Sequence, residues 1–232
     1  MKSALITGAS SGIGRAVAEL FLAEGWRVGL VARRKELLEG IAAAHENAVA
    51  LPADVTDAAA LEAAFEAFGH IDVLFNNAGM FGTAAPIDEI EVAEWEQVMM
   101  VNLHGMFLAA RLAFGAMRRQ GSGGRIINNG SISAHTPRPG SVCYTTTKHA
   151  ITGMTKSLSL DGRPFDIACG QIDIGNAETD MVAALKKVSP QTDTMGVEHA
   201  ANAVLHMAQL PPEANVQFMT VMATKMPYIG RG

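Results

Sequence analysis

Near its start, the chain has a short apolar strand that runs straight into a glycine-rich turn and then into an amphipathic helix. The strand is predicted at residues 4–7, the turn at 8–14 and the helix at 15–24. Glycines at 8, 12 and 14 let the backbone turn tightly and approach a ligand. The N-terminus of the next helix offers unpaired N–H groups and a positive partial charge. Because the turn follows a strand and opens a helix, we interpret it as a pyrophosphate cradle rather than an ordinary turn.

The rest of the chain keeps alternating apolar strands with amphipathic helices. We expect further strands at residues 26–32, 48–53, 71–76, 125–129, 166–173 and 216–223, and helices at 34–45, 58–68, 92–119, 143–160 and 197–209. Strict alternation favours a parallel sheet covered by helices. The pattern predicts an α/β, single-domain Rossmann fold over residues 1–232, with a doubly wound, mostly parallel seven-stranded sheet and helices on both faces.

Residues 176–196 interrupt this alternation with polar residues around a short helical run at 181–187. An ordinary surface connection would explain them. Loops beyond the carboxyl ends of parallel strands, however, are where α/β proteins select their substrates. We therefore favour a substrate lid over this segment.

Composition narrows the classes of function. A net charge of −5 gives no broad positive field for a nucleic acid, so we expect no such partner. Cys143 and Cys169 form no metal-spaced set, so we expect no metal site. We find no secretion signal, and no apolar stretch approaching the roughly 20 residues of a membrane-spanning helix. These features predict a soluble, cytoplasmic protein.

Tyr144 and Lys148 stand one helical turn apart, and Ser131 precedes the tyrosine in Asn-Asn-Gly-Ser-Ile-Ser. Spacing i to i+4 puts the tyrosine and the lysine on one helix face. A free tyrosine has a pKa of about 10, and a nearby ammonium would stabilise its phenolate. The three residues are therefore candidates for proton transfer, although the same spacing recurs on solvated helix faces.

The end of the second expected strand distinguishes two possible dinucleotides. An acidic residue there would bind the ribose 2′-hydroxyl of NAD, whereas NADP needs a cation. This chain has Arg33 and Arg34, whose planar donor groups suit a 2′-phosphate. We favour NADP, with NAD left open because Glu36 lies nearby and because the arginines would also suit the solvated start of a helix.

Taken together, these motifs resemble the short-chain dehydrogenase/reductase family. The resemblance runs from the first strand through Thr179, and it rests on Thr7-Gly8-x-x-x-Gly12-x-Gly14, Asn76-Asn77-Ala78-Gly79, Asn102, Ser131 and Tyr144-x-x-x-Lys148. It implies an NADP(H)-dependent oxidoreductase that transfers a hydride between nicotinamide and a small carbonyl or alcohol substrate. It also implies a homodimer or homotetramer, paired through the helices at 92–119 and 143–160.

The resemblance further implies a role for each matching residue. Tyr144 would exchange a proton with the substrate oxygen, Ser131 would hydrogen-bond that oxygen, Lys148 would lower the tyrosine pKa and hold the nicotinamide ribose, and Asn102 would hold a water next to the lysine. Asp54 would contact the adenine. The expected cofactor-binding residues are Gly8, Ser10, Ser11, Gly12, Ile13, Gly14, Arg33, Arg34, Asp54, Val55, Asn76, Ala78, Gly79, Tyr144, Lys148, Gly175 and Thr179.

Departures from the family pattern keep other functions open. Ile174 stands where family members usually have proline before Gly175, and Asp173 replaces a small apolar residue, with a neighbouring backbone group or cation as its expected partner. A cofactor-sensing protein with impaired catalysis is the main alternative, and an isomerase or dehydratase is a third. His135 and Arg138 would favour an acidic substrate, but a solvated loop is the simpler explanation, and we favour it. We assign no catalytic role to His104, His135 or His149, because none has an evident partner.

Overall fold

One parallel sheet organises the part of the chain that the computed structural model describes, which is residues 1–179, 182 and 193–229. The strand order is β3-β2-β1-β4-β5-β6-β7, and every neighbouring pair is parallel. The strands are β1 (Ser3–Thr7), β2 (Arg27–Ala32), β3 (Ala48–Pro52), β4 (Val73–Asn76), β5 (Gly124–Asn129), β6 (Ile167–Gly175) and β7 (Phe218–Met222). The predicted fold class is confirmed, with a sheet that is wholly rather than mostly parallel.

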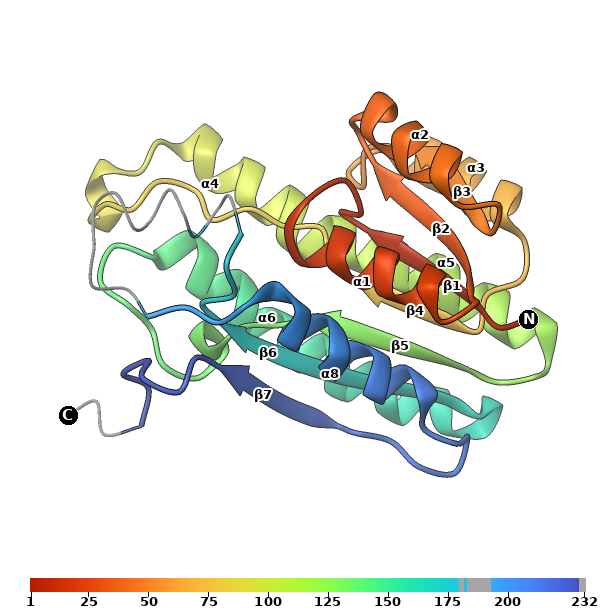
Figure 1. Ribbon diagram of the computed structural model, residues 1–232. Helices are drawn as coiled ribbons and strands as arrows, with labels where there is room; N and C mark the ends of the chain where they lie inside the picture. The colour runs from red at the N-terminus through yellow and green to blue at the C-terminus, as the bar shows by residue number, and fades with distance from the viewer. Residues whose placement is uncertain (180–181, 183–192, 230–232) are drawn as a thin grey trace.

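Helices cover both faces of this sheet (Figure 1). The main helices are α1 (Gly12–Ala23), α2 (Lys35–Ala44), α3 (Ala58–Phe68), α4 (Val92–Met99), α5 (Gly105–Gln120), α6 (Val142–Gly162) and α8 (Val197–Gln209). Short 3₁₀ turns lie at η1 (Ile87–Glu89), η3 (Ile132–Ala134) and η4 (Arg163–Phe165). Helices α1, α2 and α8 pack on one face, and α3 and α5 pack on the other.

The strands are buried on both faces because successive side chains point in opposite directions. Leu5 and Leu74 join the core under α3 and α5, whereas their neighbours Ile6 and Phe75 join the core under α1 and α8. This explains why the strands read as continuous apolar runs. The strand order reverses between β1 and β4, so a crevice is expected at the carboxyl ends of these strands.

The longest helical run corrects one expectation from the sequence. Residues 92–120 comprise α4, the π-helical η2 (Met100–His104) and α5, and their length and composition would suffice to cross a membrane. In the fold, α5 packs its apolar side, including Leu108, Ala113 and Met117, into the core. Burial against the sheet therefore accounts for part of the apolar content of the run, and apolar side chains such as Phe107 stay exposed on its other side.

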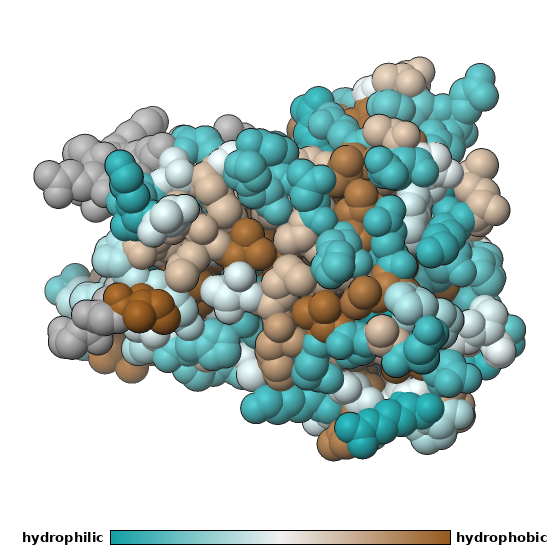
Figure 2. Space-filling model, turned by 60° about the horizontal axis from the view of Figure 1, so that its bottom comes forward, coloured by the Kyte–Doolittle hydropathy of each residue, from teal (hydrophilic) through white to brown (hydrophobic). Residues whose placement is uncertain are grey.

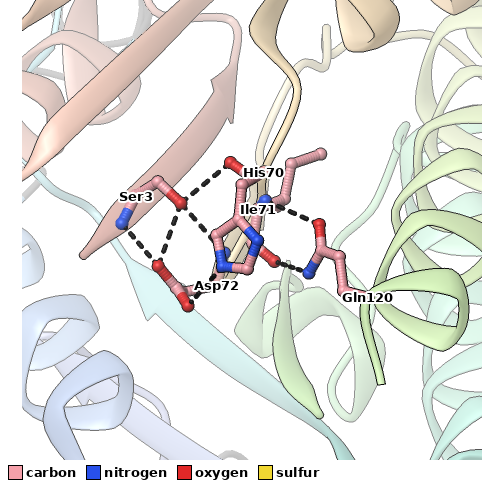
Figure 3. Close-up of polar contacts among 5 residues, drawn as sticks. All are labelled: Ser3, His70, Ile71, Asp72 and Gln120. Carbon is pink, nitrogen blue, oxygen red and sulfur yellow. Dashed lines mark hydrogen bonds and ion pairs between the residues drawn. The ribbon is translucent and has the colours of Figure 1, made fainter. Parts of the chain in front are cut away.

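A polar network fastens the opposite, amino-terminal end of the sheet (Figure 3). The Asp72 carboxylate accepts hydrogen bonds from Ser3 N at 2.7 Å and Ser3 Oγ at 2.9 Å, and lies 3.1 Å from His70 Nε2. Gln120 at the end of α5 exchanges two hydrogen bonds with the Ile71 backbone, both 2.9 Å. Burial raises the pKa of Asp72, but the hydrogen bonds from Ser3 and His70 outweigh it and hold the pKa below its usual value. The network joins β1, the start of β4 and α5.

The last strand forms one edge of the sheet. Met219 and Val221 pack against the core under α8, whereas Phe218 on the other side of the strand is exposed. Figure 2 shows hydrophobic residues reaching the surface in patches between hydrophilic ones on the side of the molecule that carries this edge. Side chains on one face of this methionine-rich strand, Met219 and Val221, thus pack into the core.

Candidate active site

A cavity of about 330 Å³ lies at the carboxyl ends of the strands, beside the point where the strand order reverses. It brings together most residues that the sequence predicted for the site. The predicted residues that line it are Gly8, Ser10, Ser11, Gly12, Ile13, Arg33, Arg34, Asp54, Val55, Ala78, Gly79, Ser131, Tyr144, Lys148, Gly175 and Thr179. Three predicted residues, Gly14, Asn76 and Asn102, do not line it.

The glycine turn forms one wall. Gly8 and Gly12 have φ angles of 71° and 56°, which L side chains rarely adopt. A Cβ on Gly14 would lie 2.3 Å from the Gly8 carbonyl oxygen, so this glycine packs α1 against the turn instead of facing the cavity. Ser11, the N-cap of α1, makes no side-chain hydrogen bond to the helix. The first N–H groups of α1 are therefore left for an anionic ligand, which fits a dinucleotide phosphate.

Arg34 spans the space between the end of β2 and the glycine turn. Its Nη2 donates to Ser10 Oγ at 2.8 Å and to Ser11 Oγ at 2.7 Å. Arg33 and Asp54 line the same cavity, and the Oδ1 of Asp54 accepts hydrogen bonds from the Thr56 backbone N–H and hydroxyl. A cation is thus fixed beside the phosphate-binding turn.

A pair of asparagines lies at the end of each of the strands β4 and β5, and in each pair the first faces the core and the second lines the cavity. Asn76 is buried and donates to Met106 O at 2.7 Å, whereas Asn77 lines the cavity and donates to Thr7 O at 3.0 Å. Asn129 Nδ2 in turn donates to Asn77 Oδ1 at 2.8 Å. Alternation along a strand explains why the second asparagine of each pair, not the first, reaches the site. Sequence analysis missed Asn77 and Asn129, although the Asn-Asn pairs at both strand ends were a usable signal.

Asn102 lies behind the cavity in the π-helical turn that joins α4 to α5. Its side chain is fully buried, accepts from Met80 N at 2.8 Å and donates to Met80 O at 2.7 Å. It also donates to Thr147 Oγ1 at 3.3 Å, one residue before Lys148. Such π-helical turns are frequent at functional sites. Here the turn places Asn102 so that it clamps the loop after β4, which lines the cavity.

Helix α6 brings the proton-transfer candidates to the other wall. The Lys148 ammonium lies 5.4 Å from the centroid of the Tyr144 ring and donates to Asn129 O at 2.7 Å. Phe81 packs against the tyrosine with the ring centroids 4.5 Å apart. Ser131, which opens η3 after β5, is almost fully buried and also lines the cavity. The three residues therefore line the same cavity as the glycine turn.

A family model described as short chain dehydrogenase matches residues 2–189. The chain belongs to this family. 2-(R)-hydroxypropyl-CoM dehydrogenase of Xanthobacter autotrophicus is 40% identical to it over 189 residues, which are 77% of this chain and 75% of that protein. The closed form of a serine dehydrogenase complexed with NADP+ superimposes with a TM-score of 0.93 at 25% identity, covering 99% of this chain and 98% of that one.

A 3-ketoacyl-(acyl-carrier-protein) reductase from Brucella melitensis, complexed with NADH, superimposes with a TM-score of 0.87 at 28% identity. The superposition covers 95% of this chain and 96% of the reductase. The chain is therefore an oxidoreductase of the short-chain dehydrogenase class, which uses a nicotinamide cofactor. These two structures contain different cofactors, NADP+ and NADH, so likeness alone does not choose between them.

The electrostatics of this dehydrogenase correct one prediction. Lys148 was expected to lower the tyrosine pKa, but burial raises the pKa of Tyr144, and the Ser131 hydroxyl and the Arg138 charge only partly oppose this. Burial also lowers the pKa of Lys148 to about 8, against the opposing effect of the Asp173 carboxylate. The cause is common to both residues, because the cavity wall removes water from the charged form of each.

His135 has a partner that sequence analysis did not find. Its Nε2 lies 2.8 Å from Asp173 Oδ2, and the other carboxylate oxygen accepts from Ser131 N at 2.8 Å and Gln171 Nε2 at 2.7 Å. Asp173 is only 1% exposed, while the His135 side chain is partly open to solvent. The expected backbone partner of Asp173 is thus found in the Ser131 N–H, and the side-chain partners are the His135 imidazole and the Gln171 amide. With isoleucine instead of proline at 174, β6 also continues in register with β7 through Gly175.

Replacing Asp173 by asparagine should lower the free energy of unfolding by about 1–2 kcal/mol, because a charged acceptor is lost from two buried hydrogen bonds and one part-buried one while its shape is kept. Chemical denaturation measures this. Asp72→Asn is the matched control, since Asp72 also accepts from a serine N–H and faces a histidine, but is more exposed. If Asp173→Asn cost no more than the control, burial of the Asp173 carboxylate would add nothing to what a more exposed carboxylate with similar partners contributes.

The predicted lid at residues 176–196 is described only at its two ends. Ala177 and Met195 form a parallel bridge, and Glu178 N donates to Met195 O at 2.8 Å. Thr179 reaches the glycine turn, where a Cβ on Gly12 would lie 3.3 Å from its methyl group. The predicted helical run at 181–187 lies, apart from Val182, outside the described residues. Closure of this segment stays a prediction.

Proposed function

We propose that this dehydrogenase is an NADP(H)-dependent carbonyl reductase or alcohol dehydrogenase in which Tyr144 donates or accepts the proton. The observation that carries the proposal is the arrangement of one cavity. It has Ser131, Tyr144 and Lys148 on one wall and the glycine turn with Arg34 on the other. A cofactor extended between the two walls would place its reactive end beside the tyrosine.

In the reductive direction, the substrate carbonyl oxygen gains a proton as its carbon gains a hydride. Bound NADPH supplies that hydride. The Tyr144 hydroxyl gives its proton to the oxygen, and Ser131 donates a hydrogen bond to the charge that develops there. Lys148, whose burial brings its pKa to about 8, is placed to return a proton to the tyrosine near neutral pH. In the oxidative direction the same proton moves back.

The preference for NADP is supported by the position of Arg34. Its guanidinium is already held by Ser10 and Ser11 at the phosphate-binding turn, and Arg33 adds a second cation. Glu36, the acidic residue that kept NAD open as an alternative, lies exposed in the first turn of α2. A planar, preorganised donor group beside the turn suits a 2′-phosphate.

Arg34→Gln should therefore weaken NADPH binding about 10- to 100-fold more than NADH binding, because a charge-assisted hydrogen bond to the 2′-phosphate is lost. Fluorescence titration with each cofactor measures the two dissociation constants. Lys35→Gln is the control, since Lys35 is the adjacent cation and pairs with Glu39 on the exposed face of α2. Equal weakening of both cofactors by Arg34→Gln would count against NADP specificity.

A cofactor-sensing protein with impaired catalysis is the second candidate. The raised pKa of Tyr144 and the replacement of proline by Ile174 favour it. Incubating the protein with a broad panel of aldehydes, ketones and alcohols while following NADPH or NADP+ separates the two proposals. Turnover of any member supports the oxidoreductase, and cofactor binding without turnover supports the sensor. Product formation without net cofactor change would indicate an isomerase or dehydratase.

We also propose a cytoplasmic location and a homodimer or homotetramer. Exposed apolar side chains on the run of residues 92–120 support pairing of this surface with a second copy. Phe107 is 50% exposed and Met100 is 41% exposed, although the same run packs its other side into the core. Light scattering combined with size-exclusion chromatography measures the number of chains, and a monomer at micromolar concentration would refute the pairing.

A further inference from the structure

One cation on the cavity wall has no part in the proposed chemistry. Arg138, in the loop between η3 and α6, lines the cavity together with Phe81 and Tyr144. Its guanidinium carbon lies 5.7 Å from the centroid of the Phe81 ring, and that ring packs against Tyr144. The order across the wall is therefore guanidinium, phenyl ring and phenol.

The Arg138 guanidinium makes no hydrogen bond or ion pair with any residue in the described part of the chain. Arg34, another arginine that lines the cavity, is instead held by Ser10 and Ser11, and the buried Arg125 donates to Asn215 and three backbone carbonyls. Nearby acids are engaged elsewhere. Asp173 accepts from Ser131, Gln171 and His135, and Glu94 accepts from the Thr83 backbone N–H. Within the described residues, the five guanidinium N–H donors therefore have no acceptor of their own, and they can point to a ligand in the cavity.

We propose that Arg138 binds an oxyanion on the substrate, so that this dehydrogenase prefers carbonyl compounds that end in a carboxylate or a similar anion. The inference rests on the proposed function and names its substrate class. The carbonyl group would lie at Tyr144, a short apolar linker over Phe81, and the anion at Arg138. Arginine presents a planar pair of N–H donors that matches a carboxylate, and a ring beside it keeps the linker dry.

Two further observations agree with this order. The Arg138 charge is close enough to Tyr144 to act on its pKa, in the lowering direction, so the two groups share one compartment. Met80, Phe81 and Met226 line the same cavity and supply apolar surface for a linker. Methionine adapts to irregular shapes, which suits a flexible chain between two polar ends.

The test compares carbonyl compounds of matched length with and without a terminal charge: 4-oxobutanoate against pentanal, and 4-oxopentanoate against 2-hexanone. With NADPH, the anionic member of a pair should have kcat/KM about 10- to 100-fold higher, the range expected for hydrogen bonds to a charged group. Arg138→Gln should remove this preference by raising KM for the anion, and Arg138→Glu should reverse it. Any effect of Arg138→Gln on Tyr144 is shared by both members of a pair, so the ratio of their kcat/KM values reports the contact with the anion.

Arg118→Gln is the matched control, since Arg118 also lies over a phenylalanine ring, 4.2 Å from the centroid of Phe165, but outside the cavity lining. Turnover of neutral carbonyls without preference for the anion, or a preference that survives Arg138→Gln, would overturn the inference and leave the proposed function standing. If no carbonyl compound were turned over, the proposed function would fail. Binding of pentanoate, followed by NMR, would then decide the inference, and equal binding to wild type and Arg138→Gln would refute it.

Discussion

Replacing Tyr144 by phenylalanine is expected to reduce turnover of a carbonyl substrate about 10²- to 10⁴-fold, the usual contribution of a positioned general acid. Cofactor binding should be unchanged, because only the hydroxyl is removed and the ring still packs against Phe81. Steady-state oxidation of NADPH measures the first quantity, and quenching or enhancement of NADPH fluorescence on titration measures the second.

The chain offers a matched control, because it has two tyrosines. Tyr228 packs beside Ile132 and Met226 but is not part of the cavity lining, so Tyr228→Phe should leave turnover within about two-fold of wild type. A Tyr144→Phe variant that kept a tenth or more of its activity would refute the role of the phenol. Loss of NADPH binding in the same variant would instead indicate that the hydroxyl supports the shape of the cavity.

Relative to wild type, Lys148→Met should be about 3 kcal/mol more stable at pH 7 than above about pH 10.5, although it removes a group proposed to act in catalysis. The reason is that burial lowers the pKa of Lys148 from 10.5 to about 8. The native state therefore holds the charged amine at a cost that the unfolded chain does not have. Urea denaturation at several pH values measures the difference between the two proteins.

The sign of the pH dependence follows from the same two values. Below about pH 8, the lysine is charged in both states and the full cost is present. Between about pH 8 and 10.5, the unfolded chain binds more protons than the native state, so the cost falls, and it vanishes at higher pH. The advantage of Lys148→Met should shrink over this interval. Lys156→Met on the exposed side of the same helix is the control, and a similar gain there would contradict this explanation.

Much of the fold was predictable because its signals are local. Each strand is an apolar run between turn residues, and the expected boundaries fall within a few residues of the observed ones. Glycines 8, 12 and 14 could be placed in a phosphate-binding turn because few other residues adopt the φ angles seen at Gly8 and Gly12. The spacing of Tyr144 and Lys148 likewise put both on one helix face, and both line the cavity.

The features of the site that could not be predicted depend on contacts between segments that are distant in the sequence. Which asparagine of a pair faces the cavity is decided by the phase of its strand, and a sequence does not fix that phase when both faces are buried. The partnership of His135 with Asp173 joins a loop after β5 to a strand far along the chain. The direction of the tyrosine pKa depends on how much water the assembled walls exclude, which no local motif reports.

The network of Ser3, His70, Asp72 and Gln120 has a consequence for how such a protein can diversify (Figure 3). It secures β1 against the start of β4 at the amino-terminal end of the sheet, opposite the end that carries Tyr144 and Arg138. Loops at the carboxyl ends of the strands can therefore be exchanged or lengthened to admit new molecules. The hydrogen bonds at the amino-terminal ends continue to hold β1 and β4 together. In this fold, the carboxyl ends of the strands can change to accept new ligands, while the amino-terminal ends keep the sheet stable.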